Sequence, residues 1–330
     1  MSKLHRWAIG LLLAIATLVS IVGWQTPSPA QADLTLEAAG LTLEELAEGV
    51  YGLIASTDFP PSNPNAAICN GGIIIGEDGV VVVDPFQNEA LANLLFETVA
   101  TLTEQPIRYV VNTHYHFDHT GGNAAAAELG YPLLGRGPIR EFMLTRNLET
   151  DPNATAPDVI VNGDGAVWLG DRQVQFAEFE GHSGGTDMVV YVPDVDVLMA
   201  GDLFFNERIP YVADGSIRLW QANLAAIAER YPTATMLPGH GVVSDRRGLE
   251  NFKSYLDYLE ATALDWQRRG LSQEEAIATT PLPAFYANYL FQGLFPLNLE
   301  VAYQQITLGQ DDAASIQRYF AQQPAALQAL

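Results

Sequence analysis

The sequence contains almost no cysteine and almost no lysine, and these absences exclude several classes of protein. Cys69 is the only cysteine among 330 residues. A single cysteine excludes an intramolecular disulfide framework and a zinc site of several cysteines, and we expect its side chain to be packed rather than reactive. Because 16 basic against 39 acidic residues give a net charge of −23, we predict no nucleic-acid partner. Metal chemistry must therefore use histidines and carboxylates.

The N-terminal residues have the layout of an export signal. Lys3 and Arg6 precede an apolar run over 7–24, and a polar stretch ends at Ala32. We predict a signal peptide over 1–32 and an exported protein, located in the periplasm or an equivalent extracytoplasmic space. The apolar run is also just long enough to span a bilayer, so a retained membrane anchor is the alternative.

Apolar periodicity in the first half of the chain predicts an α/β arrangement. Short apolar runs predict strands over 50–54, 73–75 and 80–83, the last two joined as a hairpin. Helical spacing of leucines predicts a helix over 89–102, and a buried strand follows over 107–111. Strand, helix and strand in this order are typical of an α/β domain.

The second half predicts another sheet, followed by helices. A helix with one apolar face ends at Gly270, and Ser272 with Glu275 forms a capping box that begins the next helix. We therefore expect one domain over 33–270 and a helical extension over 271–330. The strands of the second sheet are predicted over 166–169, 174–179, 188–192 and 197–200.

Three histidines and one aspartate lie within six residues, directly after the strand predicted over 107–111. Side chains alternate in direction along an extended segment, so the first two histidines can share one metal ion. A bend after them turns the aspartate and the third histidine toward a second ion. Imidazole and carboxylate ligands suit zinc, and also iron or manganese. The four residues are His114, His116, Asp118 and His119.

Three further candidate ligands each follow a predicted strand. They are His182 and His240, each preceded by glycine, and Asp202 in Gly-Asp. An isolated histidine is usually a surface or core residue. Here, however, all five histidines outside the predicted signal lie in the cluster or beside a glycine at a strand end. Because strand ends converge on one edge of a layered core, we expect these residues to meet the cluster.

The sequence resembles the metallo-β-lactamase superfamily. The resemblance consists of HxHxDH at 114–119, Gly-His at 181–182, Gly-Asp at 201–202 and Gly-His at 239–240, in the order of the family. It implies an α/β fold, the four-layer αββα sandwich, with the site at one edge of the two sheets. Asp84 matches the family's carboxylate that orients the histidine loop, although the small residue and glycine that usually follow it are missing.

The resemblance also implies a dinuclear centre and a mechanism. A hydroxide between two zinc ions would attack a carbonyl carbon, and Asp118 would be the catalytic residue that orients this nucleophile. We therefore predict an exported hydrolase of an ester, lactone, thioester or amide bond in a small-molecule substrate. The implied ligands are His114, His116 and His182 for the first ion, Asp118, His119 and His240 for the second, and Asp202 as the bridge.

Other functions stay open on this resemblance. A class B-like β-lactamase is one, although Asp202 replaces the cysteine or serine of true class B enzymes and Phe205 replaces a lysine of one subgroup. Arg208 and Arg218 are possible substitutes for that lysine. A mononuclear-iron oxygenase acting on persulfides is another, but it needs only one set of ligands. A metal-stabilised binding protein without turnover is the third.

Aromatic residues near the candidate ligands indicate an apolar pocket, with core packing as the alternative for Phe204 and Trp220. Tyr115 and Phe117 lie between ligands and are expected to point away from the metal. Four aromatic residues of the extension would cover the site or form a dimer contact; they are Phe285, Tyr286, Tyr289 and Phe291. The pocket candidates are Tyr115, Phe117, Phe204, Phe205, Tyr211 and Trp220.

Overall fold

The computed structural model describes residues 34–310 of the chain. The predicted signal peptide over 1–32 and the last part of the predicted extension, 311–330, lie outside the described residues. Within 34–310, no helix combines the length and the apolar character that crossing a bilayer requires.

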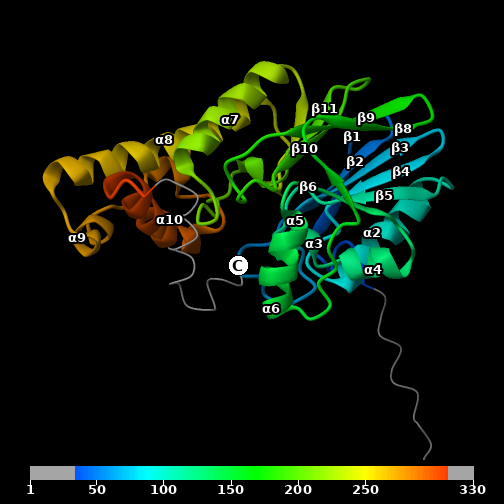
Figure 1. The fold of residues 1–330 in the computed structure, drawn as a ribbon, viewed down its shortest axis with the longest axis horizontal. Coiled ribbons are helices and arrows are strands. Elements are labelled where there is room, and N and C mark those ends of the chain that lie inside the picture. Colours follow the sequence, from blue (N-terminus) through cyan, green and yellow to red (C-terminus); the bar gives the residue numbers. More distant parts are fainter. Residues whose placement is uncertain (1–33, 311–330) are drawn as a thin grey trace, which may run out of the picture. The chain divides into compact units, whose positions relative to one another are not determined.

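The first sheet contains seven strands in the order β1-β2-β3-β4-β5-β6-β7 (Figure 1). Neighbours are antiparallel from β1 to β4 and parallel from β4 to β7. Helices α2 (Glu89–Leu102) and α4 (Asn123–Glu128) lie in two of the crossovers. The strands are β1 (Leu41–Ala47), β2 (Val50–Ala55), β3 (Gly71–Gly76), β4 (Gly79–Val83), β5 (Ile107–Val111), β6 (Leu133–Arg136) and β7 (Val159–Val161).

The second sheet contains five strands in the order β13-β11-β10-β9-β8. Strands β8 to β11 are antiparallel neighbours, and β13 joins β11 in parallel. Two short strands, β12 (Phe205–Asn206) and β14 (His240–Gly241), pair beside the sheets. The five strands are β8 (Gly165–Leu169), β9 (Arg172–Glu178), β10 (Met188–Val192), β11 (Val197–Met199) and β13 (Thr235–Leu237).

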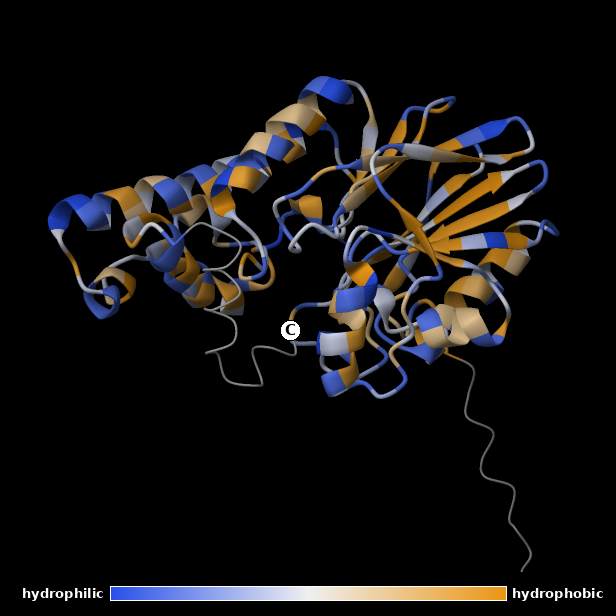
Figure 2. Cartoon of the chain, viewed as in Figure 1, coloured by the Kyte–Doolittle hydropathy of each residue, from blue (hydrophilic) through white to orange (hydrophobic). Residues whose placement is uncertain are grey.

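Alternation along the strands produces the four layers. In β4, Val81 and Val83 join the core between the two sheets, whereas Val80 and Val82 pack against α2 and α4 on the outer face. Successive side chains of a strand point to opposite faces, and both faces are covered here. Figure 2 shows the strands of both sheets as mainly hydrophobic. The predicted αββα sandwich is confirmed.

The outer face of the second sheet is covered by α7 (Ile217–Arg230) and α8 (Arg246–Arg269). Helix α8 alternates hydrophobic and hydrophilic residues (Figure 2), as expected for a helix with one buried face. It ends at Gly270, which adopts φ +64 and caps the helix as predicted.

Helical segments continue after Gly270. Helix α9 (Gln273–Ala278) begins with the predicted capping box at Ser272, and α10 (Phe295–Ala302) contacts both α8 and α9. Shorter helical turns over Ala284–Tyr286, Gln292–Leu294 and Tyr303–Thr307 complete this region. Its aromatic residues, with the exception of the exposed Phe285, pack into or against the core that α7 and α8 share with the second sheet.

The segment after β6 contains helical turns that the apolar periodicity of the sequence does not predict. It is helical as far as Thr150, through α5 (Ile139–Phe142), a π-helical turn over Met143–Asn147 and α6 (Leu148–Thr150). Ile139 and Met143 bury their side chains with Tyr115 in a small separate cluster, which stabilises these turns. The remaining helices are α3 (Phe117–Thr120) and the 3-10 turn Gly201–Leu203.

Candidate metal centre

The candidate ligands lie where parallel-running strands end. The histidine cluster follows β5, His182 follows β9, Asp202 follows β11 and His240 follows β13. Strands β11 and β13 run in parallel, and β9 runs in the same direction because both β9 and β11 are antiparallel to β10. The loops after these three strands therefore lie at one edge of the second sheet, and the contacts of His114 and His119 with Asp202 bring the cluster after β5 to the same edge, as predicted.

The structure brings all seven candidate ligands together, and each is buried. Asp202 lies between two groups of histidines. Its Oδ1 is 3.0 Å from Nε2 of His119 and 3.2 Å from Nε2 of His240. Its Oδ2 is 3.7 Å from Nε2 of both His114 and His182. One carboxylate can thus contact two cations, each held by a separate group.

The two groups match the division expected from the sequence. Ligand atoms within 4.8 Å of one another occur in His114, His116, His182 and Asp202, and again in His119, Asp202 and His240. Asp118 completes the second group, because its Oδ2 is 3.3 Å from Nε2 of His240 and 3.5 Å from Nε2 of His119.

Glycines allow the loop that carries Asp202 and the loop that carries His240 to approach each other this closely. A Cβ atom on Gly239 would overlap Oδ1 of Asp202, so the residue before His240 has to lack a side chain. Gly201 adopts φ +50, which L residues with side chains rarely adopt, and places Asp202 at the end of β11. These contacts explain the Gly-His and Gly-Asp pairs of the sequence.

Buried charges of opposite sign dominate the electrostatics. Burial opposes ionisation of Asp202, but His240 and His119 outweigh it and hold the pKa of this carboxyl well below its usual range. Burial likewise lowers the pKa of His240, yet Asp202 and Asp118 raise it overall to about 9. Asp202 and Asp118 similarly raise the pKa of His119 well above its usual value. The carboxylates therefore attract positive charge to this point.

The donor set fits metal ions. His114 Nε2 and His182 Nε2 are buried without a hydrogen-bond partner among residues 34–310. Leaving buried polar atoms unsatisfied costs about 1–3 kcal/mol each, so such atoms need an explanation. Burial also lowers the pKa of His114 well below its usual value, which keeps this imidazole neutral and able to bind a cation.

Asp84 supports the histidine loop through three contacts. Its Oδ1 accepts a 2.8 Å hydrogen bond from the Thr113 N–H, and its Oδ2 accepts a 2.7 Å bond from the Thr113 hydroxyl. The same Oδ2 lies 2.8 Å from Nδ1 of His119. This leaves Nε2 of His119 to face Asp202. Asp84 thus occupies the supporting place that the sequence comparison suggested, despite the changed residues after it.

Two supporting carboxylates were not predicted from the sequence. Asp214 lies 2.8 Å from Nε2 of His116, leaving Nδ1 of that ring as its ligand atom. Asp187 accepts hydrogen bonds from the backbone N–H groups of His182 and Ser183, at 3.0 and 2.9 Å. Its Oδ1 is also 3.4 Å from His182 Nδ1. Neither aspartate belongs to a residue pattern that identifies it in the sequence.

Asp214 also connects His116 to the helical segment after β6. The Tyr115 hydroxyl donates to Asp214, and Arg146 donates to both, with Nη1 2.6 Å from the hydroxyl and 3.1 Å from Asp214 Oδ1. Burial raises the pKa of Asp214, but the contact with His116 lowers it. The pKa of this carboxyl therefore lies below its ordinary value. Tyr115 therefore points away from the ligands, as expected.

We expect the exchange Asp214→Asn to weaken metal binding by the His116 group. A neutral amide stabilises a metal-bound imidazole less than a carboxylate does, and such changes typically reduce metal affinity about 10–100-fold. Competition with a chelator measures the effect, with Asp164→Asn at an exposed ion pair as control. Equal affinity in wild type and Asp214→Asn would show that this carboxylate does not tune the site.

Cys69 lies beside the candidate centre. Its thiol donates to the backbone oxygen of Asp118 at 2.9 Å, and its sulfur belongs to a close group with Asp118 and His119. Burial, and then the nearby carboxylates, raise the pKa of this thiol well above its usual value. A protonated thiol is a poor nucleophile, so the expected packed role agrees with its surroundings.

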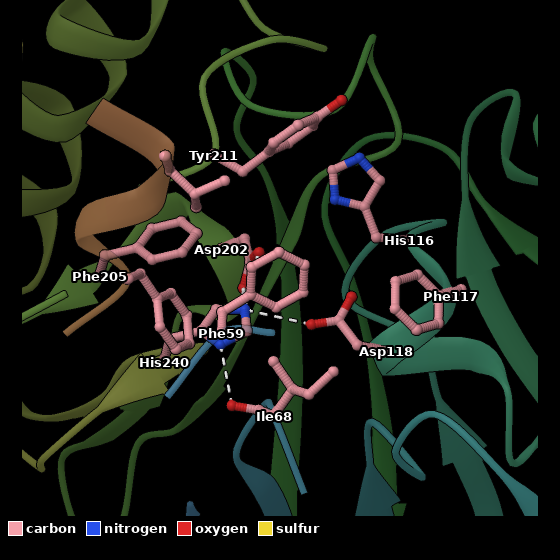
Figure 3. A pocket seen from close by; sticks show the side chains of 11 residues that line it. Phe59, Ile68, His116, Phe117, Asp118, Asp202, Phe205, Tyr211 and His240 are labelled. Carbon is pink, nitrogen blue, oxygen red and sulfur yellow. Dashed lines mark hydrogen bonds and ion pairs between the residues drawn. The ribbon is translucent and has the colours of Figure 1, made fainter. Parts of the chain in front are cut away.

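A pocket opens onto the second group of ligands (Figure 3). Asp118, Asp202, His240 and His116 contribute to its lining, and the space is about 380 Å³ with its open mouth included. The remaining lining is apolar or aromatic. It consists of Phe59, Ile68, Phe117, Phe205, Tyr211, Phe291 and Leu294.

The pocket corrects several sequence expectations. Phe117 does not point away from the site, because α3 begins at this residue and turns its ring to the mouth of the pocket. Phe204 and Trp220 are core residues instead of lining residues. Arg218 is exposed and paired with Glu260, so it cannot replace the lysine of β-lactamases.

Comparison with known proteins agrees with this geometry. The sequence model of the metallo-β-lactamase superfamily matches residues 64–240, just over half of the chain. The chain belongs to the metallo-β-lactamase superfamily. Homologues in this superfamily are metal-dependent hydrolases, and the chain is assigned to that class of enzyme.

Curated relatives of this superfamily member are distant. A hydroxyacylglutathione hydrolase of Shewanella pealeana is 23% identical over 211 residues, which cover 60% of this chain and 74% of that protein. The alpha subunit of a 2,4-dinitroanisole O-demethylase from Nocardioides sp. is 27% identical over 208 residues. That match covers 60% of each chain, so this chain matches less than two thirds of that relative.

Solved structures show the same fold. A metallo-β-lactamase from Pontibacter korlensis superposes with a TM-score of 0.56 and 24% identity, over 66% of this chain and 99% of that one. The sec-alkylsulfatase Pisa1 from Pseudomonas sp. gives a TM-score of 0.63 and 20% identity, over 82% of this chain and 51% of the sulfatase. At these identities, the likeness establishes the fold and not a substrate.

Proposed function

We propose that this protein is an exported hydrolase with two zinc ions, which cleaves an ester, lactone, thioester or amide bond in a small molecule. The observation that carries the proposal is the place of Asp202 between two separate groups of histidines. A site for one metal needs only one such group. When bound, a pair of zinc ions supplies hydroxide from water near neutral pH and polarises a carbonyl group.

The chain's own residues would position the reactants. Asp118 faces the pocket and contacts His240, so its carboxylate can orient an attacking water and accept its proton. Burial opposes ionisation of Asp118, but His119 and His240 hold its pKa below its ordinary value. The carboxylate is therefore ionised, as a proton acceptor has to be. The surrounding aromatic side chains exclude bulk water.

The alternatives are less well supported. An iron oxygenase with His114, His182 and Asp202 would not require the complete second group that Asp118, His119 and His240 form. A β-lactamase needs a cation for the lactam carboxylate, and no lysine or arginine belongs to the described lining of the pocket. The curated relatives named above include a hydroxyacylglutathione hydrolase and a subunit of a 2,4-dinitroanisole O-demethylase, and this variety favours a broad substrate panel.

Export and location are part of the proposal and depend on the predicted signal over 1–32. Secretion in culture, followed by N-terminal sequencing of the secreted protein, tests the proposed export. The acidic net charge favours a small-molecule partner and argues against a nucleic-acid partner.

The decisive experiment assays the zinc-loaded protein against thioester, lactone, aryl ester, phosphodiester and cephalosporin substrates. We expect two metal equivalents per chain by elemental analysis, and turnover of one of the carbonyl substrates without oxygen uptake. A response confined to cephalosporins would assign the β-lactamase alternative. Absence of turnover across the whole panel with both ions bound would contradict the hydrolase.

A further inference from the structure

Phe291 has the most unusual backbone among the residues that line the pocket. It adopts φ +64 and ψ +23, the left-handed region that bulky residues rarely occupy. Such a conformation costs on the order of 1–3 kcal/mol and persists only where the surroundings impose it. The strain lies at the candidate active site and not in an exposed turn, since Phe291 is only 2% exposed.

Contacts on several sides hold Phe291 in this conformation. Its N–H donates to Asp58 Oδ1 at 2.7 Å. The neighbouring residue Leu290 pairs with the strand-like segment around Arg208, where the Ile209 N–H donates to the Leu290 oxygen at 2.9 Å. The segment after Gly270 is thereby fixed to the αββα domain beside the pocket.

The Phe291 ring contacts both a candidate ligand and a second aromatic residue that lines the pocket. Its centroid is 5.3 Å from the ring of His240 and 5.8 Å from the ring of Phe59, both with edge contacts. On the far side of His240, the ring of Phe205 is stacked at 4.8 Å. In the view of Figure 3, the Phe59 ring is drawn between His240 and Asp118. Two aromatic residues from distant segments therefore pack against each other in the lining of the pocket.

The charged side chains that line the pocket are all candidate metal ligands. None of the described lining residues is lysine or arginine. Arg208 lies 5.8 Å from the centroid of Phe291, but its guanidinium donates to the backbone oxygens of Ala55 and Glu207. A carboxylate on the acyl chain of a substrate would find no lysine or arginine side chain in this lining.

We propose that Phe291 and Phe59 determine specificity, by selecting substrates whose acyl group is neutral and apolar. The inference rests on the proposed hydrolase function and names its substrate class. A carbonyl carbon near Asp118 and Asp202 directs the acyl group along the aromatic walls of the pocket, where an alkyl or aryl chain loses contact with water. An anionic acyl chain would be desolvated there without a partner.

The test compares three 4-nitrophenyl esters: acetate, hexanoate and monoadipate. Hexanoate and monoadipate have acyl chains of equal length, and only the second carries a terminal carboxylate. For the zinc-loaded full chain, we expect kcat/KM to be at least about 10-fold higher for hexanoate than for either of the other two. A wild-type preference for monoadipate over hexanoate would overturn the inference.

Phe291→Gly is the informative variant, because glycine adopts a positive φ without strain and the fold should be retained. We expect the ratio of kcat/KM for hexanoate over acetate to fall at least about 10-fold, mainly through KM. Phe285→Ala is the matched control, since Phe285 belongs to the same segment but is 64% exposed. An unchanged ratio in Phe291→Gly would contradict the assigned role.

A binding measurement separates this inference from the hydrolase proposal. If none of the esters is cleaved, titration of the zinc-loaded chain with hexanamide and with adipic acid monoamide still reports on the pocket. At least about 10-fold tighter binding of hexanamide, lost in Phe291→Gly, would support the pocket while contradicting the ester hydrolase. Equal binding of hexanamide by wild type and Phe291→Gly would overturn the inference itself.

Discussion

Replacing Asp202 by asparagine is expected to remove about one of two bound metal ions and to lower kcat/KM on the order of 10³-fold. The carboxylate has oxygens within 3.2 Å of His119 and His240 and within 3.7 Å of His114 and His182. An amide has the same shape but no negative charge, so it cannot neutralise two cations. Elemental analysis and steady-state kinetics on the same sample measure the two effects.

Asp265→Asn serves as the control for this exchange. Asp265 is an exposed aspartate of α8 that pairs with Arg268 and Arg269, far from any candidate ligand in sequence. The Asp265→Asn variant should retain both metal ions and the wild-type kcat/KM. If Asp202→Asn also kept two ions, with kcat/KM within tenfold of wild type, a bridging role for this residue would be wrong.

Replacing Asp84 by alanine is expected to destabilise the metal-free protein by about 3–5 kcal/mol. The exchange leaves the Thr113 N–H, the Thr113 hydroxyl and His119 Nδ1 without their buried acceptor. Asp84 also adopts φ +53, where alanine is strained and asparagine is tolerated. Urea unfolding should therefore show a larger decrease in the free energy of unfolding for Asp84→Ala than for Asp84→Asn.

Asp196→Ala is a matched control for the backbone strain. Asp196 adopts φ +52 and accepts hydrogen bonds from the hydroxyls of Tyr191 and Thr233, but it lies in the turn between β10 and β11. Water can replace these bonds in part, so Asp196→Ala should lower the free energy of unfolding by less, about 1–2 kcal/mol. Equal losses for the two alanine variants would show that Asp84 does not specially stabilise the histidine loop.

Local periodicity was sufficient to predict most of the fold. The helix over Glu89–Leu102 and the strand over Ile107–Val111 occur with the predicted bounds. These segments bury one face or both, so their apolar spacing identifies them. Strand β1 was not predicted, because much of it is exposed and its glutamates interrupt the apolar pattern. The helical turns before Thr150 were also missed, since they depend on contacts with Tyr115.

The sequence by itself determined the seven candidate ligands, because four of them are close along the chain and the other three stand beside glycines at strand ends. Only the tertiary structure decided what surrounds them. Asp214 meets His116 across 98 residues, and Phe291 meets Asp58 across 233. No spacing rule connects residues so far apart. Chain folding alone brings such carboxylates and aromatic rings against the ligands, and these contacts set the orientation and selectivity of the centre.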